Sequence, residues 1–305
     1  MMTSKRTRPA IWGRWIGLAT LALLAAGAGC SRAAGGAAAA APTEKRYPLH
    51  GEILSVNAQA KTLTIAHEAI PGLMPAMTME YAAGDGDLAI ARVGERIKAQ
   101  LVEDHGNYHL EDIWRDDRAA TDTVAEAANE LRQDTAARGR GAYREIGEAM
   151  PDFALFDQDG RVVQAARFRG RQIMLNFIYT RCPIATMCPA ATLRMMEVQK
   201  QARAAGVTNL QLISISLDPS YDTPGVLKEY AQARGIDTGN FAFLTGPERA
   251  IRDLLTQFGV IAEFKDGLLK HSLATLLINE QGRIIHRADG SEWTANEFVE
   301  RMHKG

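Results

Sequence analysis

The sequence predicts a small closed β-barrel followed by a larger α/β domain with a mixed sheet. Short runs in residues 47–118 alternate apolar and polar side chains, which is typical of half-buried strands. Residues 143–305 alternate continuous apolar runs with segments of helical periodicity, as expected for strands joined by helical crossovers. A charged, alanine-rich segment at 119–142 separates the two patterns and is predicted to be a helical linker.

The first 29 residues have the pattern of a secretory signal peptide. Four cations precede the apolar run 15–28, which is short for a membrane span and ends in small residues directly before Cys30. Small residues that lead into a single cysteine resemble a bacterial lipobox, so we expect a lipid on Cys30 and a flexible tether over residues 30–46. The expected product is a membrane-anchored periplasmic lipoprotein of a Gram-negative-type bacterium. Cleavage without lipidation and an uncleaved anchor are the alternatives.

The formal net charge of the chain bears on whether it binds nucleic acid. The 305 residues carry a formal net charge of −1, and loss of residues 1–29 removes four cations and no acid, which leaves −5. A mildly acidic chain has no charge-based reason to bind nucleic acid. We therefore expect no nucleic-acid partner, and contact with a membrane through the lipid anchor.

Five short strands are predicted between residues 47 and 114. Strict alternation marks the segments 62–67, 96–102 and 109–113, and turn residues stand at 85–87. Five strands in fewer than 70 residues favour closure into an OB-like barrel, because closure removes exposed sheet edges.

The pattern after Met150 has the order of a thioredoxin-like α/β fold. Two buried strands are separated by a helical crossover, and further helices and a hairpin follow. In chain order the predicted elements are strand 173–179, helix 189–205, strand 210–217, helices 224–235 and 247–258, hairpin strands 273–278 and 283–286, and helix 294–303.

Cys182 and Cys188 form an isolated dithiol at the end of the predicted strand 173–179. Pro189 suits the first turn of a helix, which places Cys188 at or near the N-cap. Unpaired N–H groups and the helix dipole are expected to stabilise a thiolate there. A dithiol on an exported domain is a disulfide, a redox switch or a soft-metal site.

His271 bears on the choice among these three. A thioredoxin-type redox enzyme carries Cys-x-x-Cys and is expected to place a cis-proline before a later strand, whereas this chain has Cys-x5-Cys and Lys270-His271-Ser272. Two thiolates and one imidazole suit copper, both as Cu(I) and as Cu(II). A structural disulfide with an unrelated histidine is the alternative.

Residues 143–305 resemble the Sco/SenC family of copper-binding, thioredoxin-fold assembly proteins. The matching motifs are Met150-Pro-Asp-Phe-Ala-Leu, Tyr179-Thr-Arg-Cys182-Pro, Cys188-Pro189, Ile213-Ser-Ile-Ser-Leu-Asp218-Pro and His271-Ser272. The resemblance implies that Cys182, Cys188 and His271 bind copper. It also implies a copper-receiving apo-protein as partner, such as the cytochrome c oxidase subunit that holds the binuclear copper centre.

Two departures from the family pattern leave a redox function open. The usual family spacing is Cys-x3-Cys, and the acid common just before the histidine is Lys270 here, while Asp266 keeps a position upstream. A cation next to the imidazole disfavours a bound dication. The alternative function is a membrane-tethered thiol–disulfide oxidoreductase, with Cys182 and Cys188 as its redox-active pair.

A second candidate metal site lies at the end of the predicted strand 62–67. Met77 and Met79 differ by two positions and share one face of a strand, and His67 ends the preceding strand. Thioethers and imidazole select Cu(I), although methionines often serve as core residues. The runs His67-Glu-Ala-Ile-Pro-Gly and Met74-Pro-Ala-Met77-Thr-Met79 are similar to the CusF family of periplasmic copper carriers. That resemblance implies Cu(I) ligation by His67, Met77 and Met79, with Met74 at the position of a capping Trp.

The combined expectation is a copper chaperone that exchanges ligands and turns over no substrate. The barrel would capture Cu(I), and the C-terminal domain would hold or transfer copper, for copper-centre assembly or copper homeostasis. The segments Asp218-Pro and Asp222-Thr-Pro224 follow the predicted strand 210–217 and are expected to cap the next helix, with a role in shaping the copper pocket as the alternative.

Overall fold

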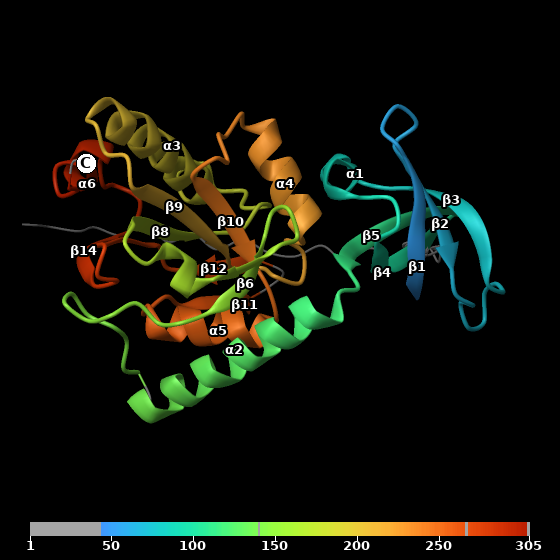
Figure 1. Cartoon of the computed structure of the whole chain (residues 1–305), viewed down its shortest axis with the longest axis horizontal. Helices are drawn as coiled ribbons and strands as arrows, with labels where there is room; N and C mark the ends of the chain where they lie inside the picture. Colours follow the sequence, from blue (N-terminus) through green and yellow to red (C-terminus); the bar gives the residue numbers. More distant parts are fainter. Residues whose placement is uncertain (1–43, 140, 266–267, 304–305) are drawn as a thin grey trace, which may run out of the picture. The chain divides into compact units, whose positions relative to one another are not determined.

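The computed structural model describes residues 44–139, 141–265 and 268–303 (Figure 1). The predicted signal peptide, Cys30, Asp266 and all but the last residues of the tether lie outside these ranges. Within the described ranges, no helix is both long enough and apolar enough to cross a membrane. The lipid site and the segment boundaries stay predictions.

A closed five-stranded barrel forms the N-terminal domain, as predicted. The strands neighbour one another in the order β1-β2-β3-β5-β4, with antiparallel pairs throughout except for a short parallel contact between β3 and β5. Closure pairs each strand on both sides, which suits strands as short as these. In chain order they are β1 (Lys45–Asn57), β2 (Thr62–His67), β3 (Met77–Ala82), β4 (Arg96–Asp104) and β5 (Asn107–Arg115).

A short helix, α1 (Asp85–Ile90), stands where the sequence indicated only a turn. Its Leu88 side chain is buried in the barrel core and anchors it. Six residues are too few to show the apolar periodicity from which helices are predicted.

The end of β2 that carries His67 lies very close to β1. Gly51 pairs with His67, and a Cβ atom on Gly51 would lie 2.5 Å from Ile65 Cγ2 and 2.9 Å from His67 Cα. Only glycine permits this approach. Side chains alternate along β2, so Leu63, Ile65 and His67 all face the buried interior.

A seven-stranded mixed sheet forms the centre of the C-terminal domain, in the order β14-β13-β8-β9-β10-β6-β7. The three central strands are parallel, and the flanking strands are antiparallel to their neighbours, which is the predicted thioredoxin-like arrangement. The predicted strands are present as β8 (Gln172–Ile178), β9 (Leu210–Ser216), β13 (Ala274–Ile278) and β14 (Ile284–Asp289).

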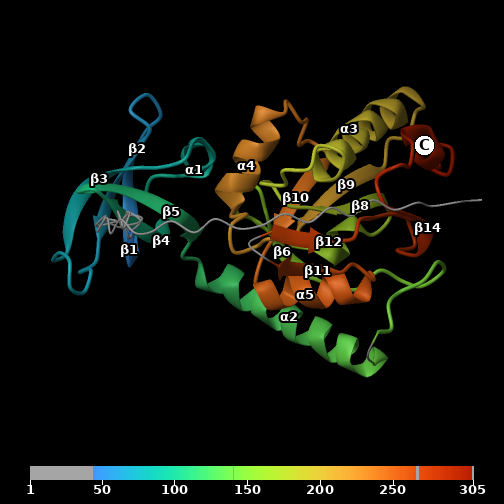
Figure 2. The ribbon, with the colours of Figure 1, turned by 180° about the vertical axis from the view of Figure 1, so that it is seen from behind.

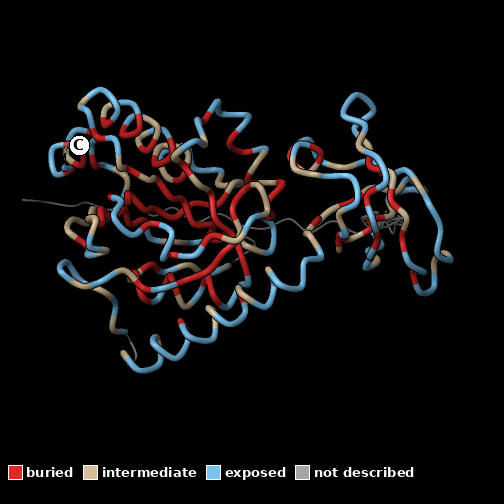
Figure 3. Tube along the Cα trace, viewed as in Figure 1, coloured by how far each residue is buried: buried red, intermediate tan, exposed pale blue. Residues whose placement is uncertain are grey.

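Helices cover both faces of this sheet (Figures 1 and 2). One face carries α3 (Cys188–Ala204), α4 (Pro224–Ala233) and α6 (Ala295–Val299), and the other carries α5 (Glu248–Gln257). The strands between them are the most buried part of the domain, and all seven residues of β8 are buried (Figure 3). The last helix ends at Val299, earlier than the predicted range 294–303.

The predicted helix between the two domains is α2 (Arg118–Arg138), capped by the side chain of Asp117. Its Leu131 packs into the core of the C-terminal domain. Gln257 Nε2 on α5 donates a 2.8 Å hydrogen bond to Asp134 on α2. The second half of α2 is therefore anchored to α5.

Five strands of three to five residues were not predicted, because alternation cannot be recognised over so short a run. They are β6 (Ala154–Asp157) and β7 (Val162–Gln164), which form a hairpin, β10 (Phe241–Thr245), and the hairpin of β11 (Ala262–Lys265) and β12 (Leu268–His271). A short 3₁₀ helix (Ala165–Phe168) follows β7. The last hairpin matters most, because β12 ends in His271.

Candidate metal centre

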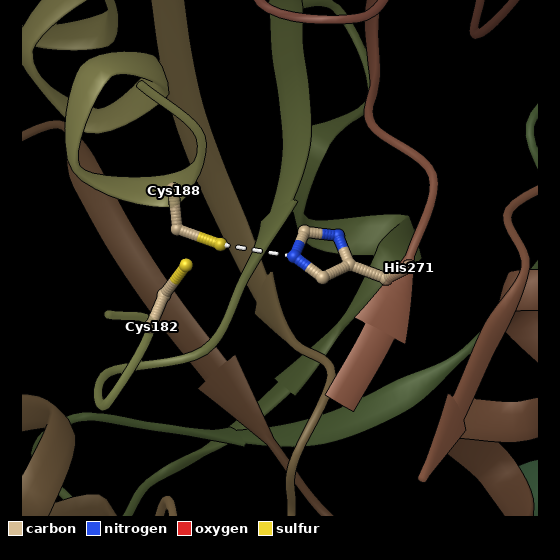
Figure 4. A group of neighbouring side chains, drawn as sticks. All are labelled: Cys182, Cys188 and His271. Atoms are coloured by element: carbon tan, nitrogen blue, oxygen red, sulfur yellow. Dashed lines mark hydrogen bonds between the residues drawn. The ribbon is translucent and has the colours of Figure 1, made fainter. Parts of the chain in front are cut away.

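Three potential metal ligands converge in the C-terminal domain. Cys182 lies in the loop after β8, Cys188 is the first residue of α3, and His271 is the last residue of β12. Their ligand atoms all lie within 4.8 Å of one another, and Cys188 Sγ is 3.5 Å from His271 Nε2 (Figure 4). Both cysteines are free thiols. The fold brings together the three residues that the sequence singled out.

The loop that carries Cys182 begins where the buried strand β8 ends. The Cys182 amide donates to the Tyr179 carbonyl (3.3 Å), which turns the chain. Pro189 stands in the first turn of α3, as predicted, and Met187 is the N-cap. As whole residues, Cys188 is buried and Cys182 is half-buried.

Burial raises the pKa of the Cys188 thiol, and the backbone amide of Tyr179 opposes only part of this rise. The neighbouring Cys182 sulfur raises it further. The prediction that the helix N-terminus stabilises a thiolate at Cys188 is therefore wrong for the metal-free protein, because removal from water outweighs the N–H groups. A metal that binds here must displace the proton, so its affinity falls as the pH falls.

His271 presents its Nε2 atom to the sulfurs because the other ring nitrogen is engaged. Nδ1 lies 3.0 Å from the Ser272 carbonyl, which accepts a hydrogen bond from a protonated Nδ1 and so leaves a lone pair on Nε2. Burial lowers the pKa of His271, which favours the neutral ring. The Ile261 amide donates to the Ser272 hydroxyl (3.0 Å) and fixes the end of the β11–β12 hairpin. A neutral imidazole with a fixed tautomer is the form that binds metals.

Two buried carboxylates hold the loop between β8 and α3. Asp222 accepts a hydrogen bond from the Thr180 hydroxyl (2.5 Å), and Asp218 accepts one from Arg181 Nε (2.8 Å). Both aspartates are fully buried. The two residues directly before Cys182 are therefore tied to the loop after β9.

Within the predicted capping segment Asp222-Thr-Pro224, the residue that caps α4 is Thr223 and not Asp222. The cap is Thr223, whose hydroxyl accepts from the Val226 amide. Asp222 accepts instead from Thr180 and from the Ser216 hydroxyl (2.6 Å). Burial raises the pKa of Asp222 to about 6, although these two hydrogen bonds act to lower it. The alternative expectation, a role in shaping the pocket, agrees with these contacts.

The sequence indicated no role for Tyr179, Thr180 or Arg181. The feature of the sequence that could have pointed to them is a run of polar side chains directly after an apolar strand. The aspartates that pair with Thr180 and Arg181 lie 42 and 37 positions further along the chain. Only the folded chain shows which carboxylate each one meets.

The barrel brings its predicted ligands to one end of its interior. His67 is 4% exposed and lies directly opposite Met77, while Met79 lies opposite Ile65. Side chains directly opposite in antiparallel strands project from the same face, so His67, Met77 and Met79 face the same way. Met77 is 44% exposed, which places it at the rim of the barrel.

Two further contacts describe this end of the barrel. His67 Nδ1 lies 2.7 Å from the Glu68 carbonyl, and its Nε2 is buried without a hydrogen-bond partner among the described residues. Tyr81 Oη donates to Met74 Sδ (3.7 Å), and the Tyr81 ring centroid is 5.9 Å from that of His67. A buried nitrogen without a partner is costly unless a ligand takes its lone pair, so a soft metal fits this place.

Two protein-family models match this chain, one over the C-terminal domain and one over the barrel. Residues 142–304 match the family model described as SCO1/SenC. The chain belongs to the SCO1/SenC family. Residues 46–115 match a second model, described as copper binding periplasmic protein CusF. Both resemblances recognised in the sequence are therefore confirmed, the first for the C-terminal domain and the second for the barrel.

Individual relatives match the C-terminal half of the chain. The SCO1 protein homolog of Bacillus subtilis is 30% identical over 151 residues, which cover 48% of this chain and 77% of that protein. The mitochondrial SCO2 homolog of Homo sapiens is 28% identical over 148 residues, or 46% of this chain and 54% of that protein. Among solved structures, a SCO1/SenC family lipoprotein from Bacillus anthracis aligns with a TM-score of 0.47 and 24% identity, over 52% of this chain and 96% of that one. The copper-bound ScoI of Bradyrhizobium japonicum aligns with a TM-score of 0.41 and 27% identity, over 51% of this chain and 96% of that one.

Proposed function

We propose that this protein is a periplasmic copper chaperone that holds copper on Cys182, Cys188 and His271 and passes it to an apo-protein. The observation that carries the proposal is the convergence of two thiols and a neutral imidazole, with all donor atoms within 4.8 Å. Thiolate sulfur selects soft copper over hard cations, and the imidazole makes the set acceptable to Cu(II) as well. Membership of the SCO1/SenC family supports the same metal.

Copper is the cargo of this protein, and delivery is ligand exchange. Cys182 is half-buried while Cys188 is buried, so a donor atom of the acceptor reaches the Cys182 side of the site first. Replacement of Cys182 by an acceptor ligand, followed by replacement of the other two ligands, moves the ion without breaking a covalent bond.

The acceptor implied by the family resemblance is the cytochrome c oxidase subunit with the binuclear copper centre. Copper homeostasis is the broader role that the same site would serve. The match of the barrel to a periplasmic copper-binding family supports a periplasmic location. A lipid on Cys30 would keep the protein at a membrane surface.

We assign the barrel the capture of Cu(I) through His67, Met77 and Met79, with Met74 beside them. The lone pair of the buried His67 Nε2 atom, unpartnered among the described residues, supports this role. Thioether and imidazole ligation is weaker than dithiolate ligation, so copper passes from the barrel to the C-terminal site. A covalent connection keeps donor and acceptor at roughly millimolar effective concentration.

The second candidate function is thiol–disulfide exchange, and the observation that favours it is the closeness of two free thiols. In that reaction the Cys182–Cys188 dithiol gives two electrons and two protons to a disulfide of an apo-protein and becomes a disulfide itself. Lys270, next to His271, favours this function because a cation disfavours a bound dication.

Anaerobic Cu(I) titration of the reduced mature chain, against a competing chromophoric chelator, tests the proposed function. We expect two equivalents, one on each domain. Cys182→Ser, Cys188→Ser and His271→Ala should each abolish tight binding at the C-terminal site, and oxidation of the dithiol should release that copper. The matched control is His303→Ala, which removes an exposed imidazole bonded to Glu280 and should bind as wild type. Unchanged affinity in His271→Ala would overturn the three-ligand site and favour the redox function.

A further inference from the structure

Helix α1 of the barrel packs directly on helix α4 of the C-terminal domain. Both helices belong to the compact unit that residues 42–305 form. Gly86 and Gly225 are buried, and a Cβ atom on Gly86 would lie 1.9 Å from the Gly225 carbonyl oxygen and 2.8 Å from the Glu229 amide nitrogen. The backbones of the two helices are therefore in contact, and only glycine permits so close an approach.

A carboxyl group without a hydrogen-bond partner lies in this contact. A Cβ atom on Gly225 would lie 1.9 Å from Asp87 Oδ1, so this oxygen lies against the first turn of α4. Asp87 Oδ1 is buried and forms no hydrogen bond with any residue that the structure describes. An ionised carboxylate in this place has lost water without gaining a donor, which is unfavourable.

The acids around Asp87 make its ionisation still less favourable. Burial raises the pKa of Asp87, and the neighbouring carboxylates of Glu229 on α4 and Asp112 on β5 raise it further, from 3.8 to about 7. Because Glu229 belongs to α4 and Asp87 to α1, part of this repulsion acts between the barrel and the C-terminal domain.

The cations near this contact are engaged by other acids. Arg115 lines the same small cavity as Asp87, and its Nε atom lies 3.3 Å from a carboxylate oxygen of Glu95. Lys61 Nζ lies 2.8 Å from a carboxylate oxygen of Asp85. Within the described ranges, Asp87 forms no ion pair that would offset its charge.

We propose that the contact between α1 and α4 is a pH-sensitive docking contact, which holds the barrel on the C-terminal domain while the Asp87 carboxyl is protonated and releases it when that carboxyl is ionised. Release returns the charge to water, while the bond between α2 and α5 keeps the two domains joined. The docked state binds the proton more tightly than the released state. Docking should therefore weaken about tenfold per pH unit between about pH 4 and about pH 7, and then level off.

This pH dependence goes beyond the proposed function and requires no copper. It also suits the copper chemistry of the C-terminal site, whose thiols must lose their protons before they bind the metal. A rise in pH favours both the release of the barrel and the binding of copper by Cys182 and Cys188.

Two measurements on the reduced, metal-free mature chain, made without lipid, follow the contact from about pH 4.5 to about pH 8. Small-angle X-ray scattering gives the radius of gyration, which should increase on release. Trp114 on β5 packs edge-on against Phe156 on β6, with ring centroids 5.7 Å apart. Its fluorescence, obtained by subtracting the signal of Trp114→Phe, should move to longer wavelength as water reaches the indole.

Two variants should hold the contact in opposite states. Asp87→Asn keeps the shape of the side chain without its charge, so it should stay docked at every pH. Gly86→Ala places a methyl group against the α4 backbone, so it should be released at every pH. The matched control is Asp104→Asn, which removes an exposed acid at the end of β4 and should keep the wild-type transition. Urea unfolding checks that each variant is folded.

A transition in wild type and in Asp104→Asn that is absent from Asp87→Asn supports the inference. A constant radius of gyration in wild type, an unchanged transition in Asp87→Asn, or a docked Gly86→Ala variant overturns it. Because no copper is present in these measurements, their outcome is independent of the copper titration that tests the proposed function.

Discussion

The Thr180 hydroxyl donates a 2.5 Å hydrogen bond to the Oδ1 atom of Asp222, which lies 42 positions further along the chain. This bond joins the loop after β8 to the loop after β9. Because Thr180 stands two residues before Cys182, the place of one proposed ligand depends on a buried carboxylate in another loop.

Removing this bond should loosen the Cys182 loop. Thr180→Val keeps the shape of the side chain but leaves the buried Asp222 without one donor, so the free energy of unfolding should fall by about 1–3 kcal/mol. Cu(I) binding should weaken about tenfold, because the sulfur must then be ordered on binding. Urea unfolding and chelator competition measure the two effects.

The control for this variant is Thr123→Val, a half-buried threonine on α2 whose hydroxyl donates a hydrogen bond to the Ala119 carbonyl of its own helix. Thr123→Val should change the free energy of unfolding and the Cu(I) affinity much less than Thr180→Val does. Wild-type copper affinity in Thr180→Val would show that the contact with Asp222 does not position Cys182.

The raised pKa of Asp222 should make stability depend on pH. Burial raises this pKa from 3.8 to about 6, so the folded chain binds the proton more tightly than the unfolded chain. The free energy of unfolding should therefore fall as the pH rises from about 4 to about 6, by on the order of 3 kcal/mol from this group, and then level off.

In Asp222→Asn the side chain is uncharged at every pH, so the free energy of unfolding should no longer fall between about pH 4 and pH 6 because of this group. Urea unfolding of wild type and variant at about pH 4.5, 5.5 and 7 measures the difference, and other titrating groups cancel in the comparison. Parallel curves for the two proteins would contradict the assignment of the slope to Asp222.

The barrel should retain Cu(I) in acid, where the C-terminal site loses it. Among the proposed barrel ligands only His67 competes with protons, because thioethers need no deprotonation, whereas both thiolates and His271 compete with protons at the C-terminal site. At about pH 5 the wild-type chain should keep its barrel copper, and Met77→Leu/Met79→Leu should keep none. The control is Met196→Leu, a half-buried methionine on α3. Wild-type binding by the double variant would show that the barrel methionines only pack.

Lipidation of Cys30 predicts firm attachment to membranes. Wild-type protein should sediment with the membrane fraction and Cys30→Ala should not, because a multiply acylated cysteine binds far more firmly than a single chain. Cys188→Ser serves as the control cysteine and should stay with the membranes. Wild-type protein in the soluble periplasmic fraction would count against the anchor.

The residues with a local signal could be predicted from the sequence. The apolar strand before Cys182, the proline after Cys188 and the histidine entering a later strand each mark their place in a few residues. The five strands of the barrel could be predicted because alternation has a fixed period of two.

What could not be predicted depends on contacts between distant segments. The segment Asp222-Thr-Pro224 predicts a helix cap, but only the folded chain shows that Thr223 is the cap and that Asp222 is buried beside Thr180. The pKa of Cys188 was predicted in the wrong direction, because a helix N-terminus is visible in the sequence and the burial around it is not. The β11–β12 hairpin that presents His271 is too short to show a pattern.

Copper transfer measured together with a count of free thiols distinguishes copper delivery from thiol–disulfide exchange. Cu(I)-loaded protein is mixed without oxygen with the reduced, metal-free copper domain of a cytochrome c oxidase subunit, and reduced metal-free protein is mixed with the disulfide form of that domain. Copper should move to the reduced domain while Cys182 and Cys188 both remain thiols, and the disulfide form should be left unreduced. Reduction of that disulfide with loss of both thiols, and no movement of copper, would contradict it.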